Sequence, residues 1–300
     1  MKSLQFITFM LAALLLFSCG RKGNNYDATG IFEATEVLVS AEATGKLLNF
    51  EIEEGTVLRA GTEVGVIDTM QLSLAKQQLE ASMKSVQSQT PDYNKQIAVT
   101  KQQIVIAQRE KRRIENLLKA GAANEKQLDD INDQIALYER QLNAQTSTLS
   151  NTTQSISQQG SAIGIQIAQT LDQLLKCYIT SPINGTVLAK YAEAGEFVSA
   201  GKPLFKIADT ENLFLRAYIT SQQLSQVKIG DKVTVVADYG GGTTKEYAGT
   251  ITWISDQSEF TPKTILTKDE RANLVYAIKI AVKNDGYLKI GMYGGVKRVE

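Results

Sequence analysis

The 300-residue sequence contains no histidine, which removes the commonest general base and metal ligand from consideration. Cysteine is almost as scarce, because Cys19 and Cys177 are the only two, too few for a disulfide framework or a zinc site. Neither sign of charge is in excess, since 32 basic residues balance 32 acidic ones. A nucleic-acid-binding chain would carry surplus positive charge. We therefore expect no metal, no cofactor and no nucleic-acid partner.

The sequence also lacks a catalytic motif. The glycine run Gly240–Gly242 precedes a lysine, but the spacing of a phosphate-binding loop is absent, and a hairpin tip is the simpler interpretation. The paired carboxylates Glu53–Glu54 and Asp129–Asp130 have no neighbouring base and are expected to be solvated. We therefore expect a protein that is not an enzyme.

The N-terminus has the pattern of an export signal. Residues 4–18 form an apolar run that is shorter than the roughly 20 residues of a membrane-spanning helix, so residues 1–18 are predicted to be a signal peptide. Leu16–Cys19 resembles a bacterial lipobox, which predicts that Cys19 is lipidated. A plain signal peptide is the alternative. Residues 19–36 are polar at first and would form a tether, and residues 26–37 could add a β-strand.

The middle of the chain, residues 71–176, predicts a long helical hairpin. Glycine is rare there, and the second half places seam residues at alternating steps of three and four, the heptad pattern of a coiled coil. These are Leu128, Ile131, Ile135, Tyr138, Leu142, Gln145, Leu149, Thr152 and Ile156. A turn is expected near residues 119–124, where Gly121 suits a helix end and Asn124 suits a helix start.

Both arms of this hairpin are predicted to have irregular helical structure at the same distance from the turn. Pro91 should break the first arm. At about the same distance beyond the turn, the Ser/Thr-rich stretch around Thr152 weakens the second arm. We therefore expect a bend or joint in both.

A short glycine-punctuated motif occurs on each side of the hairpin. GKLLNFEIEEGTVLRAG, residues 45–61, matches GTVLAKYAEAGEFVSAG, residues 185–201, so that Gly45, Gly55 and Gly61 recur 140 positions later. Each copy predicts a few short strands, too few to bury an apolar face alone. We therefore expect residues 37–70 and 177–208 to close on each other as one β-sandwich, split by the inserted hairpin. Further strand patterns in residues 209–300 predict a small β-barrel.

These features together resemble the HlyD-type membrane fusion proteins, or periplasmic adaptors. Two stretches are similar to sequences of that family: TSPINGTVLAKYAEAGEFVSAGKPLFKIAD and LKIGMYGG. A third stretch is similar to the subgroup that accompanies ABC-type exporters: EFTPKTILTKDERANLVYAIKI. The resemblance implies an elongated α+β fold: a split lipoyl-like sandwich (barrel-sandwich hybrid), a coiled-coil hairpin and a β-barrel. The family's membrane-proximal domain is expected to be short or missing. Where true lipoyl carriers hold a modified lysine, this chain has Ile67–Met70, so no carrier function is expected.

The resemblance also implies partners. Family members that dock on TolC-like outer-membrane channels have an Arg–Leu–Ser pattern at the hairpin tip, and Arg113, Leu117 and Asn124 stand at those positions here. Asn124 departs from the family's serine. The alternative is that neither residue takes part in docking: Arg113 is a solvated charge, and Leu117 packs within the hairpin.

The function expected is that of an adaptor anchored by lipid in the periplasm, with the inner membrane favoured. It would form a homo-oligomer, for which the resemblance implies a hexamer. This oligomer would connect an inner-membrane transporter, ABC-type or else RND-type, to a TolC-like outer-membrane channel. The alternative is a structural envelope lipoprotein that acts as a spacer without a transporter.

Overall fold

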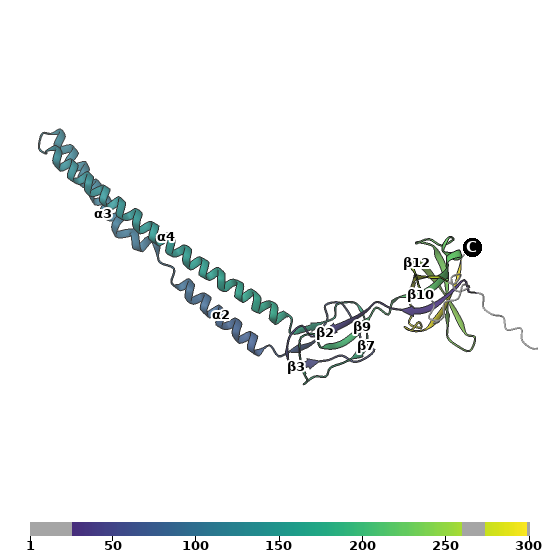
Figure 1. Ribbon diagram of the computed structural model, residues 1–300. Coiled ribbons are helices and arrows are strands. Elements are labelled where there is room, and N and C mark those ends of the chain that lie inside the picture. The colour runs from purple at the N-terminus through teal and green to yellow at the C-terminus, as the bar shows by residue number, and fades with distance from the viewer. Residues whose placement is uncertain (1–25, 260–273, 299–300) are drawn as a thin grey trace, which may run out of the picture.

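The computed structural model describes residues 26–259 and 274–298. The predicted signal peptide, Cys19 and the start of the tether lie outside these residues. Figure 1 shows an elongated molecule with a helical rod at one end, a β-sandwich in the middle and a β-barrel at the other end. The α+β architecture expected from the sequence is therefore confirmed.

The rod is a hairpin of three helices. Its first arm consists of α2 (Met70–Ser88) and α3 (Tyr93–Lys119), and its second arm is the single helix α4 (Glu125–Leu175). The first arm breaks beside Pro91, as predicted, and Asp92 caps α3 by accepting a 3.2 Å hydrogen bond from the backbone of Lys95.

The expectation of a joint in the second arm was wrong, because α4 runs for 51 residues without interruption. The hydroxyl groups of Thr148 and Thr152 donate to the carbonyl oxygens one turn earlier, at 3.0 and 2.9 Å. Because each hydroxyl bonds to a carbonyl of its own helix, it does not draw the backbone into a non-helical conformation. Low intrinsic propensity was therefore not enough to break a helix that packs against α2 and α3 on either side of the stretch.

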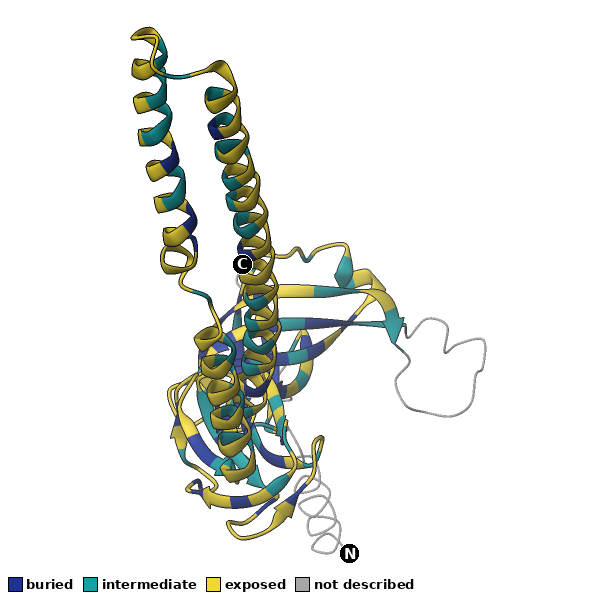
Figure 2. Cartoon of the chain, turned by 90° about the vertical axis from the view of Figure 1, so that its left-hand side faces the viewer, coloured by how far each residue is buried: buried dark blue, intermediate teal, exposed yellow. Residues whose placement is uncertain are grey.

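The seam between the arms is narrow, because two helices can bury only one stripe of each other. Few residues of the rod are buried: Ile97, Thr100 and Ala107 in α3, and Ile131, Leu149 and Thr170 in α4. Figure 2 shows this pattern as dark segments on the facing sides of α3 and α4 and exposed surface elsewhere.

The sandwich consists of two four-stranded sheets, in the orders β2-β9-β7-β4 and β6-β5-β3-β8. Each sheet takes two strands from before the rod and two from after it. The strands before the rod are β2 (Glu36–Ser40), β3 (Gly45–Phe50), β4 (Val57–Leu58) and β5 (Glu63–Ile67). Those after it are β6 (Tyr178–Thr180), β7 (Gly185–Lys190), β8 (Phe197–Val198) and β9 (Pro203–Ala208).

The two copies of the repeated motif make equivalent contacts in the two halves of the sandwich. Gly55 donates its backbone N–H to the carbonyl of Val187 at 2.8 Å, and Gly195 donates to that of Leu47 at 2.7 Å, which is the same bond with the halves exchanged. Gly55 and Gly195 have φ values of 88° and 95°, a region that favours glycine. Each half therefore completes the other half's turns, which neither could do alone.

The core of the sandwich also joins the two halves. Leu47, Ile67, Val198, Leu204 and Phe205 are all fully buried in one cluster, with Cys177 at the point where the rod re-enters. This shared core explains how a long insertion is tolerated, because the chain leaves after Ile67 and returns at Cys177 against the same strand, where Ile67 N–H donates to Cys177 O at 2.9 Å.

The barrel closes six strands in the order β1-β10-β13-β12-β11-β14 around a core that includes Phe32, Leu215 and Ile280. Its first strand precedes the sandwich in the chain. The strands are β1 (Ala28–Glu33), β10 (Asn212–Thr220), β11 (Lys232–Asp238), β12 (Thr244–Glu259), β13 (Val275–Lys283) and β14 (Tyr293–Arg298), with a short helix α5 (Ser221–Leu224) after β10.

Candidate docking site at the hairpin tip

The tip of the rod is a tight turn that the backbone closes by itself. Gly121 donates its N–H to Leu118 O at 3.0 Å, and Ala122 donates to Leu117 O at 2.8 Å. This pair of bonds is a Schellman motif, and it requires the φ of 73° that Gly121 adopts. The end of α3 is therefore rigidly defined.

Asn124 starts α4 with a complete capping box. Its Oδ1 accepts from the backbone N–H of Gln127 at 3.0 Å, and Oε1 of Gln127 accepts from the backbone N–H of Asn124 at 3.3 Å. The side-chain oxygen of Asn124 is thus engaged with its own helix. A partner at the tip would meet the side-chain amide, which is a donor.

Arg113 and Leu117 lie four residues apart and therefore on the same face of α3. Arg113 has a side chain 72% exposed and forms a 3.5 Å ion pair with Glu110, one turn earlier. Such an exposed pair contributes little to stability and exchanges readily for a better partner. Leu117 is 37% exposed, so it offers apolar surface beside a cation.

The charges near the tip differ between the two arms. The last part of α3 is rich in basic residues and ends with Lys119, whereas the first turn of α4 begins with Glu125. The helix dipole favours a positive charge at the C-terminal end of α3 and a negative charge at the N-terminal end of α4. The tip therefore presents a basic surface on α3 next to an acidic one on α4.

The described residues contain no cluster of three or more metal-ligating side chains. Among the same residues, no helix is long and apolar enough to span a bilayer. The thiol of Cys177 is buried, and this desolvation raises its pKa. It donates to the carbonyl of Gln173 at 3.4 Å, so its role is in packing.

Comparison with known proteins assigns the family. The family described as "RND MFP, barrel-sandwich hybrid domain" matches residues 35–210, more than half of the chain, and this protein belongs to that family. It is therefore a membrane fusion protein, a class of periplasmic adaptor rather than of enzyme. A UPF0194 membrane protein of Citrobacter koseri is 27% identical over 293 residues, covering 91% of this chain and 88% of the relative. One of Yersinia enterocolitica is 28% identical over 297 residues, covering 90% and 88%.

Solved structures share the fold. MacA from Actinobacillus actinomycetemcomitans matches with a TM-score of 0.56 and 20% identity, covering 92% of this chain and 79% of that one. A MacA–MexA chimera that contains the Pseudomonas aeruginosa MexA α-hairpin domain matches with a TM-score of 0.52 and 22% identity, covering 91% and 81%.

The sequence indicated Arg113, Leu117 and Asn124, and the structure places all three within the last turns around the tip. Cys19 lies outside the described residues. The spacing of Gln127, three residues after Asn124, predicted that it completes the capping box, and the structure confirms this. Sequence reasoning missed a cavity at the end of the barrel, because that cavity is assembled from separate segments.

Proposed function

We propose that this membrane fusion protein connects an ABC-type transporter in the inner membrane to a TolC-like channel in the outer membrane. The observation that carries the proposal is the division of the molecule into two ends. A rod of roughly 75 Å, from the 51 residues of α4, carries Arg113 and Leu117 to a point remote from the barrel. One chain can therefore contact partners in two different layers.

Arg113 and Leu117 suit docking on a helical partner. An arginine provides a charge-assisted hydrogen bond to a carboxylate or carbonyl, and an adjacent leucine provides an apolar anchor. The rigid turn at Gly121 holds both in one orientation, which lowers the entropy lost on binding. The side-chain amide of Asn124 would add a donor where relatives of this class have a hydroxyl.

The opposite end is proposed to face the inner membrane. Lipidation of Cys19 would leave nine residues before Ala28, a reach of roughly 30 Å when fully extended. The barrel would therefore stay near the periplasmic face of the bilayer. The resemblance of residues 259–280 favours an ABC-type transporter, while the name of the matched family makes an RND-type transporter the second candidate.

Assembly into a ring of identical subunits is part of the proposal, and six is the number that the family resemblance implies. Exposed apolar side chains run along the rod, where Val99 is 67% and Leu137 is 62% exposed. Val57 and Phe197, at equivalent positions of the two sandwich halves, are also largely exposed. A ring of subunits would cover such side chains and remove their apolar surface from water.

The test replaces Leu117 by a photo-crosslinking amino acid in the full chain and asks whether the TolC-like channel of the same cell is captured. Capture is expected at position 117 and not at Leu137, which is exposed more than three turns into α4. Arg113→Glu should abolish the cross-link and export, while Arg112→Glu makes the same charge change on a neighbouring face and should not.

The transporter is identified by co-purification with the tagged chain. A complex that contains an ATPase supports the ABC assignment, and a proton-driven transporter without one supports the RND assignment. If Arg113→Glu left the cross-link intact and Leu117→Ala left export intact, the tip would not be the docking site. Purification without any transporter would instead favour a spacer lipoprotein.

A further inference from the structure

The barrel and the sandwich are joined by one β-ribbon that continues from each domain into the other. In the barrel, β1 pairs with β10 as far as Glu33, and in the sandwich β2 pairs with β9 from Glu36 onward. Between these pairs, Asp209 donates its backbone N–H to Thr35 O at 3.1 Å. Figure 1 shows the same path, where the chain runs directly from β1 in the barrel to β2 in the sandwich. The joint is therefore hydrogen-bonded backbone and not a pair of separate linkers.

The second strand of this ribbon carries a bulge at the joint. Between the last barrel pair and the first sandwich pair, the first strand has two residues, 34–35, and the second strand has five, 209–213. The extra length forms a turn that Asp209 closes, because its Oδ1 accepts from the backbone N–H groups of Glu211 and Asn212 at 3.1 Å each. A bulge bends a ribbon locally while the pairing continues on either side.

Thr210, within the bulge, is bonded to both domains. Its hydroxyl forms a 2.8 Å hydrogen bond with the hydroxyl of Thr186 in the sandwich. Its carbonyl accepts from Nδ2 of Asn284 in the barrel, also at 2.8 Å. The backbone N–H of Asn284 donates to the next carbonyl, that of Glu211, at 2.8 Å. The bulge is therefore held from the barrel and from the sandwich at once.

The side chain of Asn284 is itself fixed by the turn that follows β13. Its Oδ1 accepts from the backbone N–H groups of Gly286 at 2.9 Å and Leu288 at 3.0 Å. Its Nδ2 donates to Leu288 O at 3.1 Å as well as to the bulge. An amide side chain offers two donors and two acceptor positions, and all four are used here. Because every polar group is satisfied in one orientation, this amide has no equivalent alternative position.

The connection is short as well as bonded. Along the first strand, Ala34 packs against the barrel core and Val37 against the sandwich core. Along the second strand, Ile207 belongs to the sandwich core and Leu213 to the barrel core. Neither segment contains glycine, which gives flexible linkers their freedom. A rotation of the barrel would therefore pull side chains out of one core or the other.

Packing between the two domains does little to set their angle. An open cleft of about 720 Å³ lies beside the joint, lined by Gly55 from the sandwich and by Lys289 from the barrel. Two domains with a small interface are expected to move relative to each other. The hydrogen bonds of Thr210 and Asn284 are therefore what opposes closure of this cleft.

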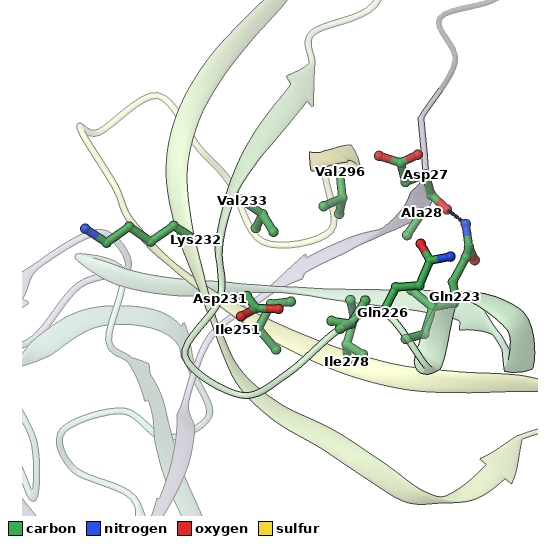
Figure 3. Close-up of a pocket in the computed structure, with 12 residues that line it drawn as sticks. Asp27, Ala28, Gln223, Gln226, Asp231, Lys232, Val233, Ile251, Ile278 and Val296 are labelled. Carbon is green, nitrogen blue, oxygen red and sulfur yellow. Dashed lines mark hydrogen bonds between the residues drawn. The ribbon is translucent and has the colours of Figure 1, made fainter. Parts of the chain in front are cut away.

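The ribbon is also fixed at its far end, beside a cavity of about 380 Å³ that all six barrel strands line. Gln223 of α5 donates its Nε2 to Asp27 O at 2.6 Å, just before β1 begins (Figure 3). A Cβ at Gly295 in β14 would lie 2.3 Å from the ring of Tyr26, so this ring packs directly on the glycine. The first strand of the ribbon is therefore held along its length within the barrel.

We propose that the barrel and the sandwich move as one rigid body, so that a transporter which displaces the barrel turns the sandwich by the same angle. The bulge at Thr210 sets the angle between the domains, and Thr186 and Asn284 hold it. The consequence for transport rests on the proposed adaptor function, whereas the rigidity of the joint does not.

The test is double electron–electron resonance on the full chain in nanodiscs. Nitroxide labels are placed at Tyr293→Cys in the barrel and Phe197→Cys in the sandwich, where the native residues are 69% and 70% exposed. The unsubstituted chain, treated with the same label, gives the background of the native cysteines. The labelled pair should give one narrow distance distribution. Insertion of three glycines after Thr210 provides the reference for a loose joint and should broaden the distribution about twofold.

Two substitutions locate the bonds that hold the angle. Asn284→Asp keeps the acceptor oxygen and removes the donor to Thr210 O, and Thr210→Val removes the hydroxyl that meets Thr186. Each should broaden the distribution, and the double variant should approach the glycine insertion. Asn49→Asp makes the matched change on the exposed surface of β3 and should leave the distribution narrow. Circular dichroism verifies that all variants fold.

A distribution in the parent as broad as that of the glycine insertion would overturn the proposal. A distribution that stays narrow in the folded double variant would overturn it too, because other contacts would then hold the joint. Absence of the cross-link at position 117 would contradict the adaptor proposal and leave the distance distribution unaffected, so the two proposals fail separately.

Discussion

The hydroxyl of Thr100 in α3 donates a 2.9 Å hydrogen bond to Oε1 of Gln145 in α4 and so links the two arms of the rod. Thr100 is only 3% exposed, and Gln145 stands at a seam position of the heptad pattern. An apolar seam permits the helices to slide by a turn, whereas a buried polar pair is satisfied in one register alone. We infer that this bond selects the register that brings α3 to its turn.

Thr100→Val tests that inference. The change keeps the volume and removes the donor, so the free energy of unfolding of the rod should fall by about 0.5–1.5 kcal/mol. Circular dichroism in urea measures the change. The double variant Thr100→Val/Gln145→Leu should recover the stability, since both polar groups are then gone. Further loss in the double variant would contradict a simple hydrogen-bond role.

Asp92→Ala is expected to fray the start of α3, because the carboxylate caps the backbone of Lys95 at 3.2 Å. Loss of such a cap costs about 1 kcal/mol. Hydrogen exchange should show faster exchange in the first turn of α3 and no change in α4. Asp133→Ala, an exposed residue within α4, is the control. Equal exchange in both variants would show that the joint at Pro91 does not depend on the cap.

Gly185→Ala and Gly160→Ala should have opposite effects. A Cβ at Gly185 would lie 2.2 Å from the carbonyl oxygen of Ala208, which is backbone of the paired strand and cannot turn aside. We expect a loss of more than about 2 kcal/mol in unfolding free energy. A Cβ at Gly160, in α4, meets nothing within 4 Å, so alanine should stabilise the helix by about 0.5–1 kcal/mol. Urea titrations of both variants measure these two changes in the free energy of unfolding.

The barrel is predicted to lose stability in acid through Asp285. The side chain of Lys245 donates to this carboxylate and lowers its pKa below the ordinary value of 3.8, and Tyr247 donates to it at 3.1 Å. A lowered carboxyl pKa stabilises the fold above the unfolded value and loses that effect as pH falls through the folded value. The unfolding free energy should therefore decline below about pH 4.

Fluorescence of Trp253, the only tryptophan, reports unfolding of the barrel in urea at each pH. Asp285→Asn should give a shallower decline between pH 5 and pH 2, because the substituted amide does not titrate in that range. Asp256→Asn, in the same strand as Trp253, should retain the decline of the parent. An unchanged slope in Asp285→Asn would assign acid sensitivity to other groups.

Much of the fold was predictable because its signals are local or periodic. The recurrence of Gly55 at Gly195 predicted a sandwich made from two halves, since a turn with positive φ favours glycine wherever it occurs. Pro91 predicted the break in the first arm for an equally local reason. Arg113 and Leu117 were indicated by the family resemblance at the turn, and their docking role stays a proposal.

Other features depended on contacts between distant segments. The Ser/Thr-rich stretch around Thr152 has weak helix propensity, yet packing along the rod keeps α4 continuous. The polar link from Thr100 required a facing residue 45 positions away. The cavity above Ile278 exists only because six strands from both ends of the chain close into one barrel.

The sequence by itself therefore determined the order of sandwich, rod and barrel and the place of the turn, since periodicity and glycine act within a few residues. Only the tertiary structure decided the register of the two arms, the continuity of α4 and the closure of six strands around the cavity in the barrel. Those depend on which side chains meet across space, and spacing along the chain does not specify that.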